Sequence, residues 1–258
     1  MPRYMLVIEY DGAPFAGWQR QENALAVQQV VEEAIEAFAG RPVRLHCAGR
    51  TDAGVHALHQ VAHVDLDKPM PIDTVRDATN AHMRDYPVVV REVREVGEGF
   101  HARLSASKRH YLYRILNRPA PPSVDRSRVW HVRQRIDVDV MREAAARLVG
   151  HFDFTTFRAS QCQGKSPIKT LERLDVERVG DEIHVYASSR SFLHHQVRSM
   201  VGTTAQAGIG RWSVDDVAAA LAAKDRRACG PVAPAEGLYF IGVDYPETAP
   251  PVQAASNP

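Results

Sequence analysis

The chain has 258 residues, enough for one or two domains, and its 45% hydrophobic and 24% charged residues exclude a wholly disordered protein. The formal net charge of +1 excludes a global basic field, so any contact with nucleic acid must depend on local charge. No apolar run reaches the roughly 18 residues of a membrane helix, and acidic residues interrupt the N-terminus before a signal-peptide core could form. Three scattered cysteines exclude a disulfide framework and indicate a reducing cytoplasm.

The first part of the chain mixes strand and helix patterns. Between residues 24 and 38 apolar side chains recur at spacings of three and four, which is typical of a helix, and Gly40 and Pro42 end the pattern. In chain order the sequence predicts a strand at 4–10, this helix, strands at 43–47 and 60–65, a helix at 72–83 and a strand at 88–93.

Beyond Gly97 and Gly99 the alternation begins again. We expect Gly150 to stop a helix, and Val179-Gly180-Asp181 to turn a hairpin. The predicted elements are a strand at 109–116, a helix at 138–149, strands at 168–178 and 182–188, helices at 194–207 and 214–223, and a last strand at 237–245. The Pro/Ala-rich tail is predicted to be disordered.

The distribution of these elements indicates an α+β protein with two halves, each large enough for its own core. We expect an N-terminal subdomain at 1–104, a C-terminal subdomain at 105–246 and a disordered tail at 247–258.

Two segments resemble nucleotide-binding motifs but do not meet the requirements of those motifs. Gly164-Lys165-Ser166 has the ending of a phosphate-binding loop, but Ala159 stands where that loop needs glycine, and no predicted strand leads into it. Gly208-Ile209-Gly210 follows a helix, the wrong context for a dinucleotide-binding turn. The sequence therefore predicts no cofactor.

Histidines cluster at His56, His59 and His63, with a second pair at His194 and His195. Structural zinc sites need ligands that converge on one point. On a strand, His59 and His63 share a face but lie too far apart to hold one ion unaided. We expect no metal, and interpret these side chains as hydrogen-bonded or surface histidines.

The segment C-A-G-R-T-D-A-G-V-H-A, residues 47–57, is the strongest candidate for chemistry. Gly49 and Gly54 bracket Arg50 and Asp52, so this loop between two strands can hold a short acidic tip rigidly. The arginine can anchor a charged partner or lower the pKa of the carboxyl group. An ionised carboxylate on a stiff loop suits nucleophilic or electrostatic catalysis.

This loop closely resembles the catalytic signature of the tRNA pseudouridine synthase A family, also called the TruA family. Further similar segments extend the resemblance over residues 1–246: E-Y-D-G-A-P-F-A-G-W-Q-R-Q at 9–21, F-H-A-R-L-S-A-S-K-R-H-Y-L-Y at 100–113, F-L-H-H-Q-V-R-S-M-V-G at 192–202 and A-E-G-L-Y-F at 235–240.

The resemblance implies isomerisation of uridine to pseudouridine at positions 38, 39 and 40 of the tRNA anticodon stem-loop, with Asp52 as the nucleophile. This reaction needs no cofactor. The carboxylate could attack the uracil ring, attack the sugar anomeric carbon or assist a glycal-type route, and the sequence does not choose among them. The implied fold is two ferredoxin-like subdomains, each similar to an RNA-recognition motif, joined in one continuous antiparallel sheet with a central active-site cleft.

The resemblance also assigns three substrate-binding residues. Arg50 would hold the target nucleotide after it leaves the stack, Tyr111 would stack on the flipped uracil, and Arg198 would pair with the catalytic aspartate. We interpret Tyr113, which shares a face with Tyr111, as a core residue.

Local charge suits an RNA partner. Residues 103–135 carry nine basic side chains against the single acid Asp125, with aromatic residues interleaved. The family resemblance further implies a homodimer that receives tRNA. Two alternatives remain: a non-catalytic RNA-binding protein on the same scaffold, and a metal-dependent hydrolase that uses the histidines.

Overall fold

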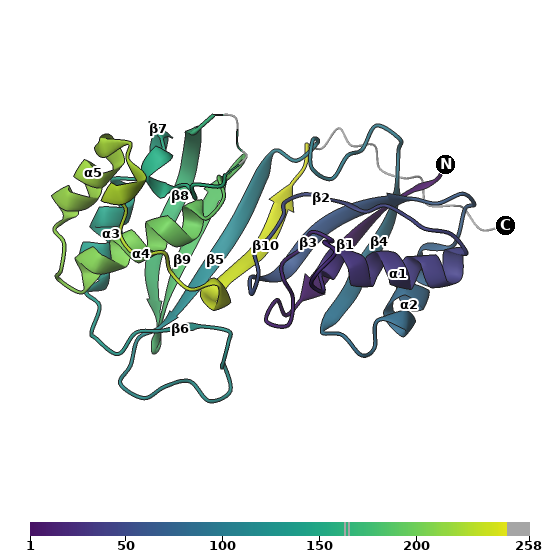
Figure 1. The fold of residues 1–258 in the computed structure, drawn as a ribbon, viewed down its shortest axis with the longest axis horizontal. Coiled ribbons are helices and arrows are strands. Elements are labelled where there is room, and N and C mark those ends of the chain that lie inside the picture. Colours follow the sequence, from purple (N-terminus) through teal and green to yellow (C-terminus); the bar gives the residue numbers. More distant parts are fainter. Residues whose placement is uncertain (163, 165, 247–258) are drawn as a thin grey trace. The chain divides into compact units, whose positions relative to one another are not determined.

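The computed structural model describes residues 1–162, 164 and 166–246, and Figure 1 shows the order of its elements along the chain. The chain forms two compact units. Of the described residues, the first unit contains 1–107 together with 240–246, and the second contains those between 108 and 239. The predicted disordered tail at 247–258 and Lys165 of the rejected phosphate loop lie outside the described residues.

The first unit has the β-α-β-β-α-β order of a ferredoxin-like fold. Strand β1 lies between β4 and β3, antiparallel to both, and the short β2 pairs with β3. Its elements are β1 (Arg3–Tyr10), α1 (Val27–Ala39), β2 (His46–Cys47), β3 (His56–Asp65), α2 (Ile72–His82) and β4 (Val88–Val96).

The core of this unit follows from the two side-chain periods. Leu6 and Ile8 alternate along β1 and are fully buried, while Val31 and Ile35, one helical turn apart on α1, are fully buried too. Gly40 ends α1 with a left-handed φ of 76°, as the sequence predicted. Tyr245 donates a hydrogen bond to the carbonyl oxygen of Ala102, so the last described residues pack within this unit.

The second unit has the strand order β5-β9-β8-β7, all antiparallel, with β6 parallel to β5. Helix α3 contacts α4, α5 and strand β8. Its elements are β5 (Lys108–Leu116), β6 (Trp130–His131), α3 (Val138–Ala146), β7 (Gly150–Asp153), β8 (Ile168–Val179), β9 (Glu182–Ser189), α4 (Gln196–Gly208) and α5 (Val214–Ala223). Strand β10 (Leu238–Asp244) follows, beginning among residues of the second unit and ending among those of the first.

The predicted α+β class and most elements are confirmed, but several boundaries were wrong. The predicted strand at 43–47 shrinks to His46–Cys47, because that segment pairs with β3 over two residues only. Helix α3 ends at Ala146, and Gly150, predicted as its stop, begins strand β7. Strands β6 and β7 were not predicted, since segments of two and four residues are too short to display a period of two.

The predicted helix at 194–207 begins two residues late. His195 adopts a left-handed φ of 63°, a conformation from which a right-handed helix cannot propagate, so α4 starts at Gln196. His194 therefore lies before the helix and does not share a helical face with Arg198. Val197, Met200, Val201 and Thr204 are all buried, so they form the inward face of α4.

Helices within the described ranges are short. The longest, α1 and α4, have 13 residues each, whereas a membrane span needs about 20. Of the described residues, none belongs to a helix long and apolar enough to cross a membrane.

Candidate active site

The R-T-D loop, residues 48–55, connects β2 to β3 in the first unit. Arg50 is exposed, Thr51 is buried and Asp52 is partly buried. Arg50 and Asp52 therefore occupy the same short loop, and both are within reach of solvent, as a site that receives a substrate requires.

Backbone hydrogen bonds fix this loop at several points. Ala48 N donates to Val61 O at 2.7 Å, and Val55 N donates to Asp52 O at 3.1 Å, which closes a turn around the acidic tip. Trp18 N donates to Thr51 O at 3.0 Å, so a segment more than thirty residues earlier holds the residue next to Asp52. The main chain on both sides of Asp52 is thus constrained.

Two buried side chains add to this support. The hydroxyls of Tyr10 and Thr51 are 2.7 Å apart, and Gln60 Nε2 donates to Gly49 O at 2.7 Å. Burial raises the pKa of Tyr10 well above its usual range, so this phenol stays protonated and neutral. We define Tyr10, Thr51 and Gln60 as the loop anchor.

Close packing leaves the loop little room to move. Gly17 has a φ of 100°, and a Cβ atom there would lie 2.7 Å from Thr51 O. A Cβ atom at Gly12 would lie 2.0 Å from Val55 O. Both positions require glycine because the segment that precedes α1 lies directly against the R-T-D loop.

The titratable side chains near the R-T-D loop serve the structure rather than the chemistry. Burial raises the pKa of Cys47 to about 12, so its thiol stays protonated and is a poor nucleophile. His56 Nδ1 lies 3.1 Å from both Gly12 N and Asp11 Oδ1, and His63 Nδ1 accepts a hydrogen bond from Ala102 N at 3.1 Å. His56 and His63 thus use a ring nitrogen to satisfy buried backbone groups.

Tyr111 and Arg198 belong to the second unit. Tyr111, on β5, is 9% exposed, and its ring meets Phe192 edge-on with centroids 5.1 Å apart. Arg198, on α4, donates from Nε to Ala233 O at 2.8 Å. Tyr113 is fully buried and donates to Pro234 O at 2.7 Å, which confirms its interpretation as a core residue.

Sequence reasoning did not find the loop anchor. Tyr10 ends a strand pattern, where an aromatic residue is ordinary core, and Gln60 begins another. Trp18 and Gly17 lie in the segment noted for its family resemblance, without any role assigned. The spacing of Gly12 and Gly17 before the helix was the only local signal that a second segment of chain approaches closely here.

Known proteins are similar to this chain over the part that contains the R-T-D loop. A family model described as tRNA pseudouridine synthase matches residues 6–104 and 144–246, which include Arg50, Asp52 and Arg198 but not Tyr111. The chain is 61% identical over 249 residues to a tRNA pseudouridine synthase A of Methylobacterium nodulans, covering 96% of this chain and 98% of that one. It is 58% identical over 245 residues to the protein of that name from Parvibaculum lavamentivorans, covering 95% of this chain and 100% of the relative. The chain belongs to the tRNA pseudouridine synthase family.

Proposed function

We propose that this protein isomerises uridine to pseudouridine at positions 38, 39 and 40 of the tRNA anticodon stem-loop. The glycosidic C–N bond breaks, the uracil turns, and a bond forms from C1′ of the ribose to C5 of the ring. N1 gains a proton and C5 loses one, so the overall reaction is an isomerisation. The similar proteins of Methylobacterium nodulans and Parvibaculum lavamentivorans are named tRNA pseudouridine synthase A.

The observation that carries this proposal is the fixed main chain on both sides of Asp52. Trp18 N and the Tyr10 hydroxyl both contact Thr51, the residue immediately before it. A nucleophile that is held in place does not lose orientational freedom in the transition state, so a larger share of the binding energy lowers the barrier. Attack on the ring, attack on C1′ and a glycal route all use a carboxylate in this position.

Three other residues contribute to substrate binding in this proposal. Tyr111 stacks on the flipped uracil, and its edge contact with Phe192 supports the ring orientation. Arg50, exposed beside Asp52, holds the extruded nucleotide by its phosphate. Arg198 supplies a cation whose side chain is fixed through its bond to Ala233 O. The first subdomain then carries the nucleophile, and the second carries the tyrosine strand and the arginine helix.

We further propose that the protein acts in the cytoplasm as a homodimer that binds tRNA. The scattered free cysteines suit a reducing compartment.

The test uses tRNA transcripts that carry uridine tritiated at C5, incubated with the full chain and no added metal, in parallel samples with and without excess chelator. Isomerisation releases the tritium, and sequencing of the product then maps the modified uridines. We expect release from positions 38, 39 and 40. Binding without release from any tRNA would support the non-catalytic RNA-binding alternative, and release that stops on chelation would support a metal-dependent enzyme.

A further inference from the structure

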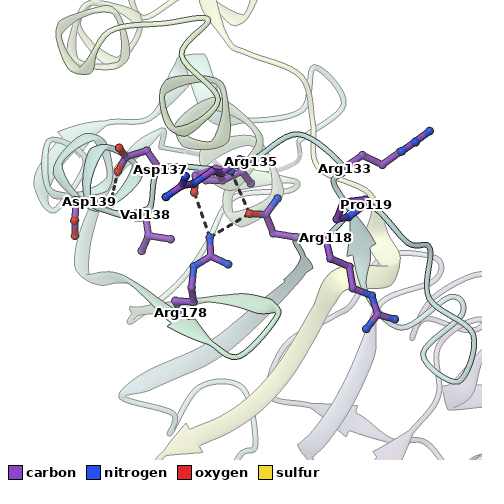
Figure 2. Close-up of a pocket in the computed structure, with 10 residues that line it drawn as sticks. Arg118, Pro119, Arg133, Arg135, Asp137, Val138, Asp139 and Arg178 are labelled. Carbon is purple, nitrogen blue, oxygen red and sulfur yellow. Dashed lines mark hydrogen bonds between the residues drawn. The ribbon is translucent and has the colours of Figure 1, made fainter.

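A hollow of about 580 Å³ lies in the second unit, and none of the proposed site residues lines it (Figure 2). Four arginines and two aspartates dominate its lining, which contains no aromatic residue: Asn117, Arg118, Pro119, Arg133, Arg135, Ile136, Asp137, Val138, Asp139 and Arg178. We call it the arginine hollow. Pockets for small organic ligands are mostly apolar, so this lining is better suited to an extended anion.

The charges in the arginine hollow are only partly neutralised. Asp137 caps α3 by accepting from the backbone N–H groups of residues 139 and 140, and Asp139 pairs with Arg142. Arg118 pairs with Asp181 at 3.1 Å. Both acids of the lining are thus engaged within their own helix, and neither is paired with the arginines beside them.

Arg133 and Arg135 are exposed, and no other group in the described part of the chain forms a hydrogen bond or ion pair with either guanidinium. The main chain that carries them is nevertheless well held. Asn117 Nδ2 donates to Val132 O at 3.0 Å and to Gln134 O at 2.6 Å, and Asn117 Oδ1 accepts from Ile136 N at 3.1 Å. One asparagine thus pins the residues before, between and after the two arginines.

Arg178 completes the support. It donates to both Asn117 Oδ1 and Ile136 O, drawn as dashed lines in Figure 2, at 3.1 and 3.2 Å. Its charge remains in the hollow while its hydrogen bonds stabilise the wall. A guanidinium presents a fork of donors that matches phosphate oxygens.

We propose that the arginine hollow, whose lining includes no residue of the R-T-D loop, binds the phosphate backbone of tRNA, with Arg133 and Arg135 as the contacting groups. The identity of the RNA rests on the proposed function. The family model leaves residues 105–143 unmatched, and every lining residue except Arg178 falls in that segment.

The test measures tRNA affinity by filter binding between about 50 and 300 mM salt for the full chain and its variants. Each phosphate contact contributes roughly 0.7–0.9 to the slope of log affinity against log salt. The double variant Arg133→Ala/Arg135→Ala should lower this slope by about one to two and weaken binding on the order of tenfold at low salt. Arg133→Lys/Arg135→Lys should keep the slope, because lysine retains the charge.

The control for net charge is Lys68→Ala/Arg84→Ala, before and after α2, where the same charge is removed from two exposed positions outside the hollow. Its slope should remain that of the wild type. An unchanged slope in the Arg133/Arg135 alanine variant, with an unchanged melting temperature, would overturn the proposal, as would an equal loss in the lysine variant.

Tritium release separates this proposal from the function on which it rests. At saturating tRNA the alanine variant should retain the wild-type kcat while its KM rises. Failure of the wild type to release tritium would reject the proposed reaction, whereas the salt slope would still decide whether the hollow binds RNA backbone.

Discussion

The R-T-D loop and the arginine hollow are held in different ways. Backbone-to-backbone hydrogen bonds hold the R-T-D loop, and glycines let the segment before α1 come into van der Waals contact with it. Asp52 itself is only partly exposed. In the hollow, a single asparagine side chain spans the wall, and the functional groups extend from it on long flexible side chains. Bond rearrangement at one carbon requires a fixed nucleophile, whereas attraction to a repeating phosphate chain tolerates several orientations.

The largest expected effect is a loss of turnover with little loss of tRNA affinity, and it comes from a change in the R-T-D loop. Asp52→Asn keeps the shape of the side chain and removes the proposed nucleophile, so turnover should fall by at least about a thousandfold. Tritium release measures the turnover, and filter binding should show tRNA affinity within a few-fold of the wild type. Near-normal turnover would reject the assignment of Asp52.

Gly17→Ala tests whether the loop depends on close packing. The new methyl group would meet Thr51 O at 2.7 Å in a backbone with positive φ, so unfolding stability should fall by about 2–4 kcal/mol and turnover with it. Gly40→Ala is the matched control, because its φ is 76° but nothing lies within 4 Å. Denaturant unfolding of both variants gives the comparison, and equal losses would show that φ alone matters.

The base of the loop should respond to acid. Burial and the nearby His101, Arg3 and His46 lower the pKa of His63 to about 4, below the 6.5 of an unfolded chain. The unfolded state therefore takes up the proton first, and stability present above pH 6.5 is lost as the pH falls toward 4, by about 3 kcal/mol at most.

Unfolding in urea across this pH range measures that loss. His63→Asn, which keeps an acceptor for Ala102 N, should flatten the profile, while His82→Asn on the exposed end of α2 should leave it unchanged. A profile in His63→Asn as steep as that of the wild type would assign the acid sensitivity elsewhere.

Asn117→Ala gives the corresponding disruption of the hollow. Losing its four hydrogen bonds should cost about 1–3 kcal/mol, with water replacing part of the loss. In contrast to Gly17→Ala, the kcat at saturating tRNA should be retained. A loss of kcat comparable to that of Gly17→Ala would mean that the two regions do not differ as described.

The smallest effect concerns the loop anchor. Tyr10→Phe should lower the free energy of unfolding by about 1–2 kcal/mol and kcat about tenfold without changing KM, because Thr51 loses its partner beside Asp52. Tyr4→Phe, on the same strand and equally buried, loses its bonds to Met70 and should affect stability alone. Thr51→Ser should retain turnover, since the hydroxyl remains.

The sequence patterns predicted which helices and strands form more accurately than where each begins and ends. Alternation and helical spacing located β1, α2 and α5 within a residue or two, because each repeats buried positions at the period of its own structure. The start of α4 was missed because it depends on the φ of one histidine, and β7 because a glycine can equally end a helix or begin a strand.

The same limit applies to the candidate site. The R-T-D loop was found from its own residues and from the resemblance of its segment, but the contact between Tyr10 and Thr51 joins residues 41 positions apart. No periodicity within either segment encodes that contact. The hollow was anticipated only as excess basic charge, since a sequence does not reveal that one asparagine fixes both arginines.

The discontinuity of the first unit has a consequence for synthesis. Residues 240–246 belong with residues 1–107, and Ser107 N and Tyr245 OH both form hydrogen bonds that need this segment. The second unit is thus an insertion within the first. During translation the first unit stays incomplete until the 132 residues of the second unit have been synthesised. The second unit can therefore finish folding before the first, the reverse of the usual N-terminal-first order in multidomain chains.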